Sequence, residues 1–99
     1  MDELLKPDDF TPYVDRVFRV RNGGHALTLT AVEQRRLESW ETQMQLREPF
    51  NLIFRGPMGD VLRAGLYTLD VEDGPAFELY VIPIHTPARD RQNYQAAFN

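Results

Sequence analysis

The chain has 99 residues, of which 42% are hydrophobic and 26% are charged, and its formal net charge is −4. A chain of this length has room for one hydrophobic core, so we expect a single globular domain over residues 1–99. The acidic balance argues against nucleic acid and anionic membranes as partners, and no apolar run approaches the ~20 residues that cross a bilayer.

The N-terminal segment predicts one short helical turn. Asp8 or Asp9 is placed to cap it, with Phe10 and Tyr13 on one side, and Pro12 limits its length. The segment before it is acidic and has neither the basic start nor the apolar stretch of a signal peptide. We therefore expect a cytoplasmic protein.

The next segment predicts a β-hairpin. Residues 17–21 alternate apolar and polar side chains and end at Asn22-Gly23, a strong signal for a tight turn with positive φ at both central positions. Residues 26–32 form the returning strand in this interpretation. Its core-facing side chains would be Leu27, Leu29 and Ala31.

Residues 33–46 are ambiguous between a helix and a long polar loop, because apolar residues approximate a helical stripe among good helix formers. We interpret them as a loop with one helical turn. Trp40 then either covers an open end of the core or anchors a protein partner, since Trp is enriched at interface hot spots. The candidate partner-binding residues of this loop are Arg36, Leu37, Trp40 and Met44.

The second half of the chain predicts further strands. Phe50, Leu52 and Phe54 alternate with Asn51, Ile53 and Arg55 before the turn pair Gly56-Pro57. The remaining predicted strands are residues 66–71, 77–84 and 94–99, with a hairpin turn at 72–75. Six short strands without a long helix indicate an all-β fold, either a small antiparallel β-barrel or a compact sandwich.

Four pieces of the sequence resemble a family of small bacterial proteins of unassigned function, about 100 residues long. These are Asp9-Phe10-x-Pro12, the hairpin 18–29, the segment REPFxLxFRGP at 47–57, and VIPI at 81–84 with YxAxFN at 94–99. The resemblance implies a setting beside phage-tail-like or tail-collar proteins and carries no catalytic residues. The sequence departs from the family pattern at 88–93 and around Trp40.

The residues suited to catalysis or metal binding do not cluster. There is no cysteine, Ser39 is the lone serine and lacks a nucleophile-elbow motif, and His25 and His85 lack the spacing of a zinc site. We therefore expect no enzyme activity, metal or cofactor. An enzyme would require His25 or His85 to converge with carboxylates in a cleft.

The sequence thus favours a non-catalytic interaction protein, an accessory or assembly factor that binds a protein partner through the 34–46 loop and an exposed sheet edge. Its oligomeric state is left open between monomer and homodimer. The alternative is a small-ligand-binding barrel whose pocket is lined by Tyr67, Phe77 and Tyr80.

Overall fold

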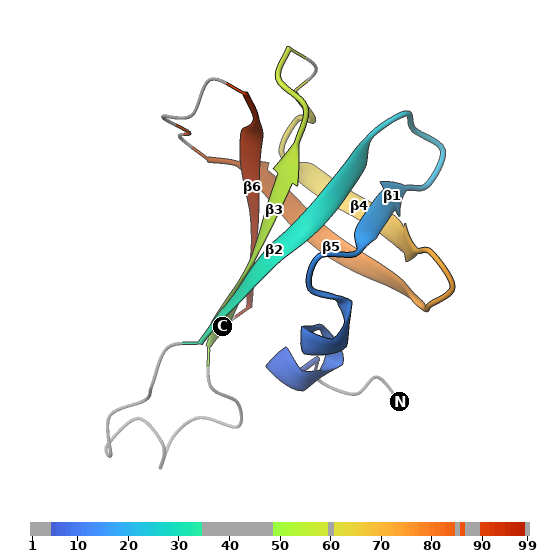
Figure 1. Ribbon diagram of the computed structural model, residues 1–99, viewed down its shortest axis with the longest axis vertical. Coiled ribbons are helices and arrows are strands. Elements are labelled where there is room, and N and C mark those ends of the chain that lie inside the picture. Colours follow the sequence, from blue (N-terminus) through green and yellow to red (C-terminus); the bar gives the residue numbers. More distant parts are fainter. Residues whose placement is uncertain (1–4, 35–48, 60, 85, 87–89, 99) are drawn as a thin grey trace.

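The computed structural model describes residues 5–34, 49–59, 61–84, 86 and 90–98 and shows a closed six-stranded antiparallel β-barrel (Figure 1). Two 3-10 turns, η1 (Pro7–Asp9) and η2 (Thr11–Tyr13), precede the barrel. Within the described residues, neither of these helical turns is long enough to cross a membrane. The strands are β1 (Val17–Val20), β2 (Ala26–Gln34), β3 (Phe50–Gly56), β4 (Gly65–Val71), β5 (Ala76–Pro83) and β6 (Gln92–Phe98).

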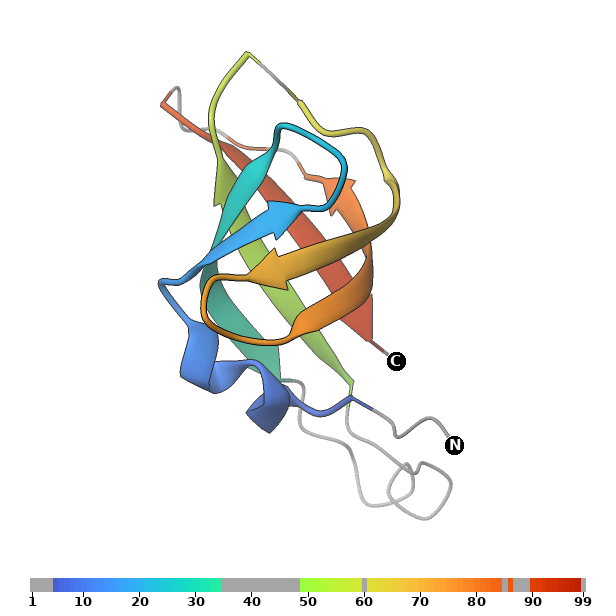
Figure 2. The ribbon, with the colours of Figure 1, turned by 90° about the vertical axis from the view of Figure 1, so that its right-hand side faces the viewer.

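The barrel consists of two three-stranded meanders, β1-β2-β3 and β4-β5-β6, in the cyclic order β1-β2-β3-β6-β5-β4. Each strand pairs antiparallel with both neighbours, and a crossover between β3 and β4 joins the meanders (Figure 2). The predicted all-β fold with a short N-terminal helical turn is confirmed. Closure decides between the two architectures, because the structure is a barrel and not a sandwich.

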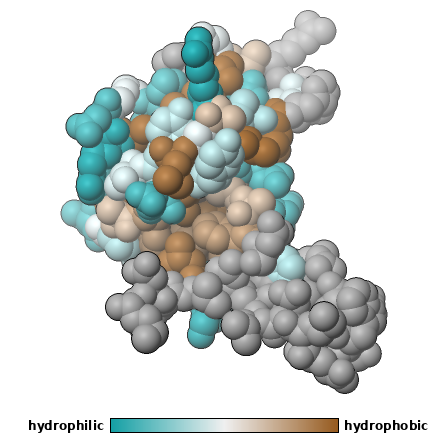
Figure 3. All heavy atoms as spheres, turned by 180° about the vertical axis from the view of Figure 1, so that it is seen from behind, coloured by the Kyte–Doolittle hydropathy of each residue, from teal (hydrophilic) through white to brown (hydrophobic). Residues whose placement is uncertain are grey.

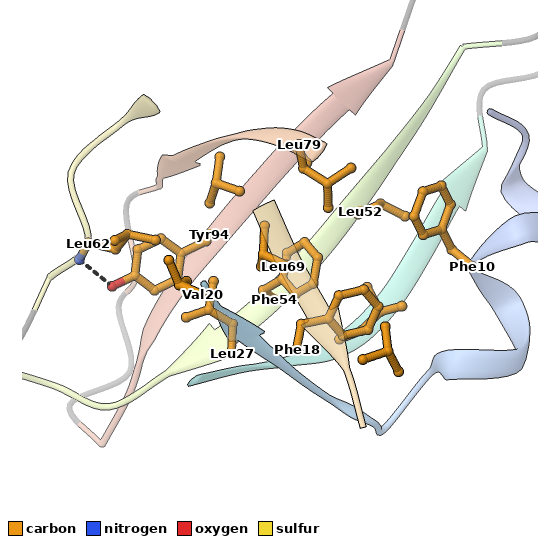
Figure 4. Close-up of a cluster of buried hydrophobic side chains, with 14 of the residues drawn as sticks. Phe10, Phe18, Val20, Leu27, Leu52, Phe54, Leu62, Leu69, Leu79 and Tyr94 are labelled. Carbon is orange, nitrogen blue, oxygen red and sulfur yellow. Dashed lines mark hydrogen bonds between the residues drawn. The ribbon is translucent and has the colours of Figure 1, made fainter. Parts of the chain in front are cut away.

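Alternation along the strands fills the interior with large apolar side chains (Figure 4). In β3 the predicted inward set is confirmed: Phe50, Leu52 and Phe54 are each at most 1% exposed. The largest other fully buried residues are Phe10, Phe18, Leu27, Leu29, Leu69, Leu79, Val81 and Tyr94. Burial of this interior is the main favourable contribution to folding.

The prediction that Ala31 faces the core is wrong. The β2–β3 register shifts between Leu29 and Ala31, so that Ala31 pairs with the outward-facing Ile53. Thr30 occupies this β-bulge, and its hydroxyl donates a hydrogen bond to the Ile53 carbonyl at 3.1 Å. One extra residue reverses the alternation, and Val32 takes the inward position against the core.

The first hairpin turn also differs from the predicted two-residue form. Asn22 has positive φ (63°), but Gly23 does not, and the connection runs from the end of β1 to Ala26. The Gly23 N–H donates to the Val20 carbonyl at 3.2 Å, which closes a four-residue turn with Asn22 in third position. The β4–β5 hairpin is built the same way. There the Gly74 N–H donates to the Val71 carbonyl, and Asp73 has a φ of 58°.

The N-terminal turns close one end of the barrel. The N-cap residue of η1 is Lys6 and not the predicted Asp8 or Asp9. Asp9 is the third residue of this turn, and its carboxylate accepts a hydrogen bond of 2.7 Å from the Lys6 N–H. Phe10 is fully buried and its ring lies 4.6 Å from that of Phe77 and 5.7 Å from that of Phe98, measured between centroids. The N-terminal segment is therefore part of the core.

Candidate interaction surface

The predicted partner-binding residues Arg36, Leu37, Trp40 and Met44 lie outside the described residues. The structure does fix the two ends of their segment. β2 runs two residues beyond its predicted end, and its last residue, Gln34, pairs with Phe50 at the start of β3. The β2–β3 connection therefore leaves the barrel at the end that Phe10 closes (Figure 1).

The three residues of the predicted ligand pocket do not line one pocket. Phe77 and Tyr67 pack against the core, and the Tyr67 hydroxyl donates to the Arg63 carbonyl at 2.7 Å. Tyr80 is 58% exposed and lies on the outer face of β5. The physical reason is the period of two along a strand: residues 77, 79 and 81 face inward, so residue 80 faces outward.

Tyr80 belongs instead to an exposed apolar patch on β4 and β5. It is the cross-strand partner of Leu66, which is 60% exposed, so the two side chains lie side by side on the outer face. Ile82 follows two residues later on the same face and is half-buried. We call Leu66, Tyr80 and Ile82 the β4–β5 patch. Two neighbouring large side chains this exposed are a feature of interaction surfaces.

A seam in the barrel wall lies next to this patch. β5 pairs with β4 from Gly65–Val81 to Asp70–Ala76, but with β6 at Ile82–Gln95 and Pro83–Tyr94. Toward the N-terminal end of β5, β5 and β6 diverge (Figures 1 and 2). The face viewed in Figure 3 has a hydrophobic recess in its lower half. β5 therefore pairs with β6 only near its C-terminal end, and the buried Phe10 packs against Phe77 of β5 and Phe98 of β6 where the two strands separate.

The edge of β5 along the seam presents backbone hydrogen-bonding groups. The Val71 N–H donates to the Pro75 carbonyl at 3.0 Å, so these two residues form a hydrogen-bonded pair. Hydrogen-bonded and non-hydrogen-bonded pairs alternate along an antiparallel ladder, so every second residue of β5 bonds to β4. The N–H and C=O groups of Glu78 and Tyr80 consequently point away from β4 and toward the seam. Within the described strands, neither residue has a ladder partner on β6. An extended peptide could pair with these groups.

The charged groups near β4 are arranged as a surface ion pair. The Arg21 guanidinium bonds both carboxylate oxygens of Asp70, at 2.5 and 3.1 Å. The hydrogen bond from Arg21 lowers the pKa of Asp70, because it stabilises the ionised form. Within the described part of the chain, no group of three His, Asp or Glu residues is arranged to hold a metal ion. His25 lies in the β1–β2 connection, and His85 is outside the described residues.

The domain of unknown function DUF6916 matches residues 5–98, which is almost the whole chain and all six strands. The chain belongs to the DUF6916 family. The DUF6916 match agrees with the expected family of unassigned function, and it does not bear on the setting beside phage-tail-like proteins. No curated protein and no solved structure matches the chain.

Sequence reasoning missed the β4–β5 patch, although a signal for it was present. Aligning the two strands around the 72–75 turn places Leu66 opposite Tyr80, and both have the opposite parity to the buried Leu69 and Leu79. Counting parity from the turn would have separated Tyr80 from Phe77. The seam has no comparable signal, because it depends on where two strands separate in space.

Proposed function

We propose that this protein is a non-catalytic interaction protein, an accessory or assembly factor that binds a protein partner. The observation that supports this most directly is the exposed cross-strand pair of Leu66 on β4 and Tyr80 on β5, beside the part of β5 that has no ladder partner on β6 among the described residues. Aromatic side chains on a rigid sheet are typical anchors of protein interfaces. The interior holds large side chains at most 1% exposed, which favours this function over a ligand-binding barrel.

In the proposed complex, an extended segment of the partner pairs with the edge of β5 at Glu78 and Tyr80. Main-chain hydrogen bonds would supply affinity, and side chains on alternate sides of the added strand would supply specificity. Side chains on one side would face inward along the seam. Those on the other side would pack beside Tyr80. The 34–46 loop with Trp40 is a second proposed contact region.

The proposed setting is assembly alongside phage-tail-like proteins. It is supported by the resemblance of REPFxLxFRGP at 47–57 and YxAxFN at 94–99 to a family associated with such proteins. These two segments form β3 and β6, which are neighbours in the barrel. They belong to the scaffold, so partner choice would reside in the β4–β5 patch and the loops.

The test is site-specific photo-crosslinking in the native host. A photoreactive phenylalanine analogue replaces Tyr80 in one variant and Arg19 in the other. Arg19 is an exposed outward residue of β1, so it serves as the matched control. We expect one protein adduct from position 80 and none from position 19. Circular dichroism checks that both variants fold.

A second variant tests whether the partner binds through the apolar side chains of the β4–β5 patch or only lies near them. Leu66→Ser combined with Tyr80→Ser removes the exposed apolar area with little effect on folding, because both side chains are more than half exposed. Crosslinking from position 82 in this background should then be lost. If the adduct persisted, or if positions 80 and 19 labelled the same proteins, the β4–β5 patch would not be the binding surface.

A further inference from the structure

A separate polar hollow of about 250 Å³ lies over the C-terminal end of β3. It is on the outer face of the barrel, because Ala26, Thr28 and Arg55 alternate with the buried Leu27 and Phe54. Two neighbouring strands, β2 and β3, contribute to it, and the connection before β6 contributes Asp90 and Arg91. The hollow is therefore distinct from the β4–β5 patch.

Small or rigid residues leave the space that larger side chains would fill. Ala26 and Pro57 line the hollow beside Thr28 and Arg55, and Arg91 lies on its β6 side. Ala26, Thr28 and Arg55 are held by the strands of the barrel. Asp90 and Arg91 lie in the connection that leads into β6.

The charges around the hollow favour an anion. Two arginines, Arg55 and Arg91, line it together with one acidic residue, Asp90. Within the described part of the chain, neither arginine side chain has a hydrogen bond or an ion pair. Arg21 is different, because its guanidinium is already paired with Asp70. The hollow thus concentrates unpaired positive charge on a chain whose net charge is −4.

We propose that this hollow binds an oxyanion group, a carboxylate or a phosphate, held between Arg55 and Arg91. The planar guanidinium fork matches two oxygens of either group, and charge-assisted hydrogen bonds are the stronger kind. The Thr28 hydroxyl adds a third donor at the β2 side. Asp90 opposes binding electrostatically, so it limits affinity for a free anion.

The experiment is a titration of amide chemical shifts with inorganic phosphate and, separately, with acetate, at constant ionic strength kept with sodium chloride. We expect saturable shifts confined to residues around Thr28, Arg55 and Arg91. Phosphate saturating alone would assign a phosphate, and acetate saturating alone would assign a carboxylate. Both outcomes support the site. If neither anion gave saturable shifts there, the proposal would be overturned.

Three variants test the electrostatic argument. Arg55→Gln should weaken the titrating anion about tenfold or more, because it removes a charge-assisted hydrogen bond. Lys6→Gln makes the same charge change beside η1, at the end of the barrel opposite to the hollow, and should leave the affinity unchanged. Asp90→Asn should strengthen binding several-fold. Equal effects of Arg55→Gln and Lys6→Gln would show that net charge alone attracts the anion and would reject the site.

Discussion

The backbone N–H of Leu62 donates a hydrogen bond of 2.9 Å to the hydroxyl of Tyr94 (Figure 4). Leu62 lies in the crossover between the two meanders, and Tyr94 is a fully buried residue of β6. The bond satisfies a buried main-chain donor that no strand reaches. Tyr94 therefore fixes the connection that allows the two meanders to close into one barrel.

Removing this hydroxyl should destabilise the protein measurably. In Tyr94→Phe the ring still fills the core, but the Leu62 N–H loses its acceptor, so the free energy of unfolding should fall by about 1–3 kcal/mol. Urea denaturation followed by circular dichroism measures the change. Tyr80→Phe is the matched control. Its hydroxyl is at the surface, and its effect should stay within about 0.5 kcal/mol. Equal losses in both variants would contradict the role of the Leu62–Tyr94 bond.

Gly56 is required by packing at the end of β3. A Cβ at this position would lie 2.9 Å from Leu27 Cδ2 and 3.0 Å from Tyr94 Cε1, both of which are core atoms. Gly56→Ala should therefore lower the free energy of unfolding by about 1–3 kcal/mol through overpacking. Gly24→Ala has no atom within 4 Å of the added Cβ and serves as the control. Thermal and urea unfolding of both variants give the comparison. An unchanged free energy of unfolding in Gly56→Ala would contradict this role of Gly56.

The strands of this fold were predictable where local signals agreed. Phe50, Leu52 and Phe54 alternate between a proline and a Gly-Pro pair, and the structure buries all three. Ala31 was assigned to the wrong face because the Thr30 bulge depends on pairing with β3, which a local pattern does not contain.

The candidate surface was less predictable than the fold. The aromatic residues predict a pocket that includes Tyr80, but the period of two along β5 places Tyr80 on the outer face. The seam and the polar hollow arise from the arrangement of residues distant in sequence. Thr28, Arg55 and Arg91 come together because β2, β3 and β6 are neighbours in the barrel, and no local sequence pattern predicts this strand order.

The relative stability of two aromatic variants tests the role assigned to Trp40. Phe54 is fully buried, so Phe54→Ala should lower the free energy of unfolding by about 3–5 kcal/mol. Trp40→Ala should cost much less if this residue serves partner binding. Urea denaturation of the two variants under the same conditions gives the comparison. Equal losses would make Trp40 a core residue and remove it from the interface.

The Arg21–Asp70 pair should make stability depend on acid pH. Because Arg21 lowers the pKa of Asp70 in the folded state, the pair contributes stability above the unfolded-state pKa of Asp70. That contribution is lost as the pH falls through the lower, folded-state pKa. Wild-type protein should therefore be more stable than Asp70→Asn near neutral pH, and the difference should vanish in strong acid.

The measurement is the difference in urea midpoint between wild type and Asp70→Asn across this acid range. The other carboxylates titrate in both proteins, so their contribution cancels in this difference. Both partners are substantially exposed, at 53% and 43%, so salt at about 1 M should shrink the difference by screening. The difference in urea midpoint between wild type and Arg21→Gln should show the same pH dependence, because this variant removes the other partner of the pair. A difference that stayed constant through the acid range would show that Asp70 acts through packing and not through its charge.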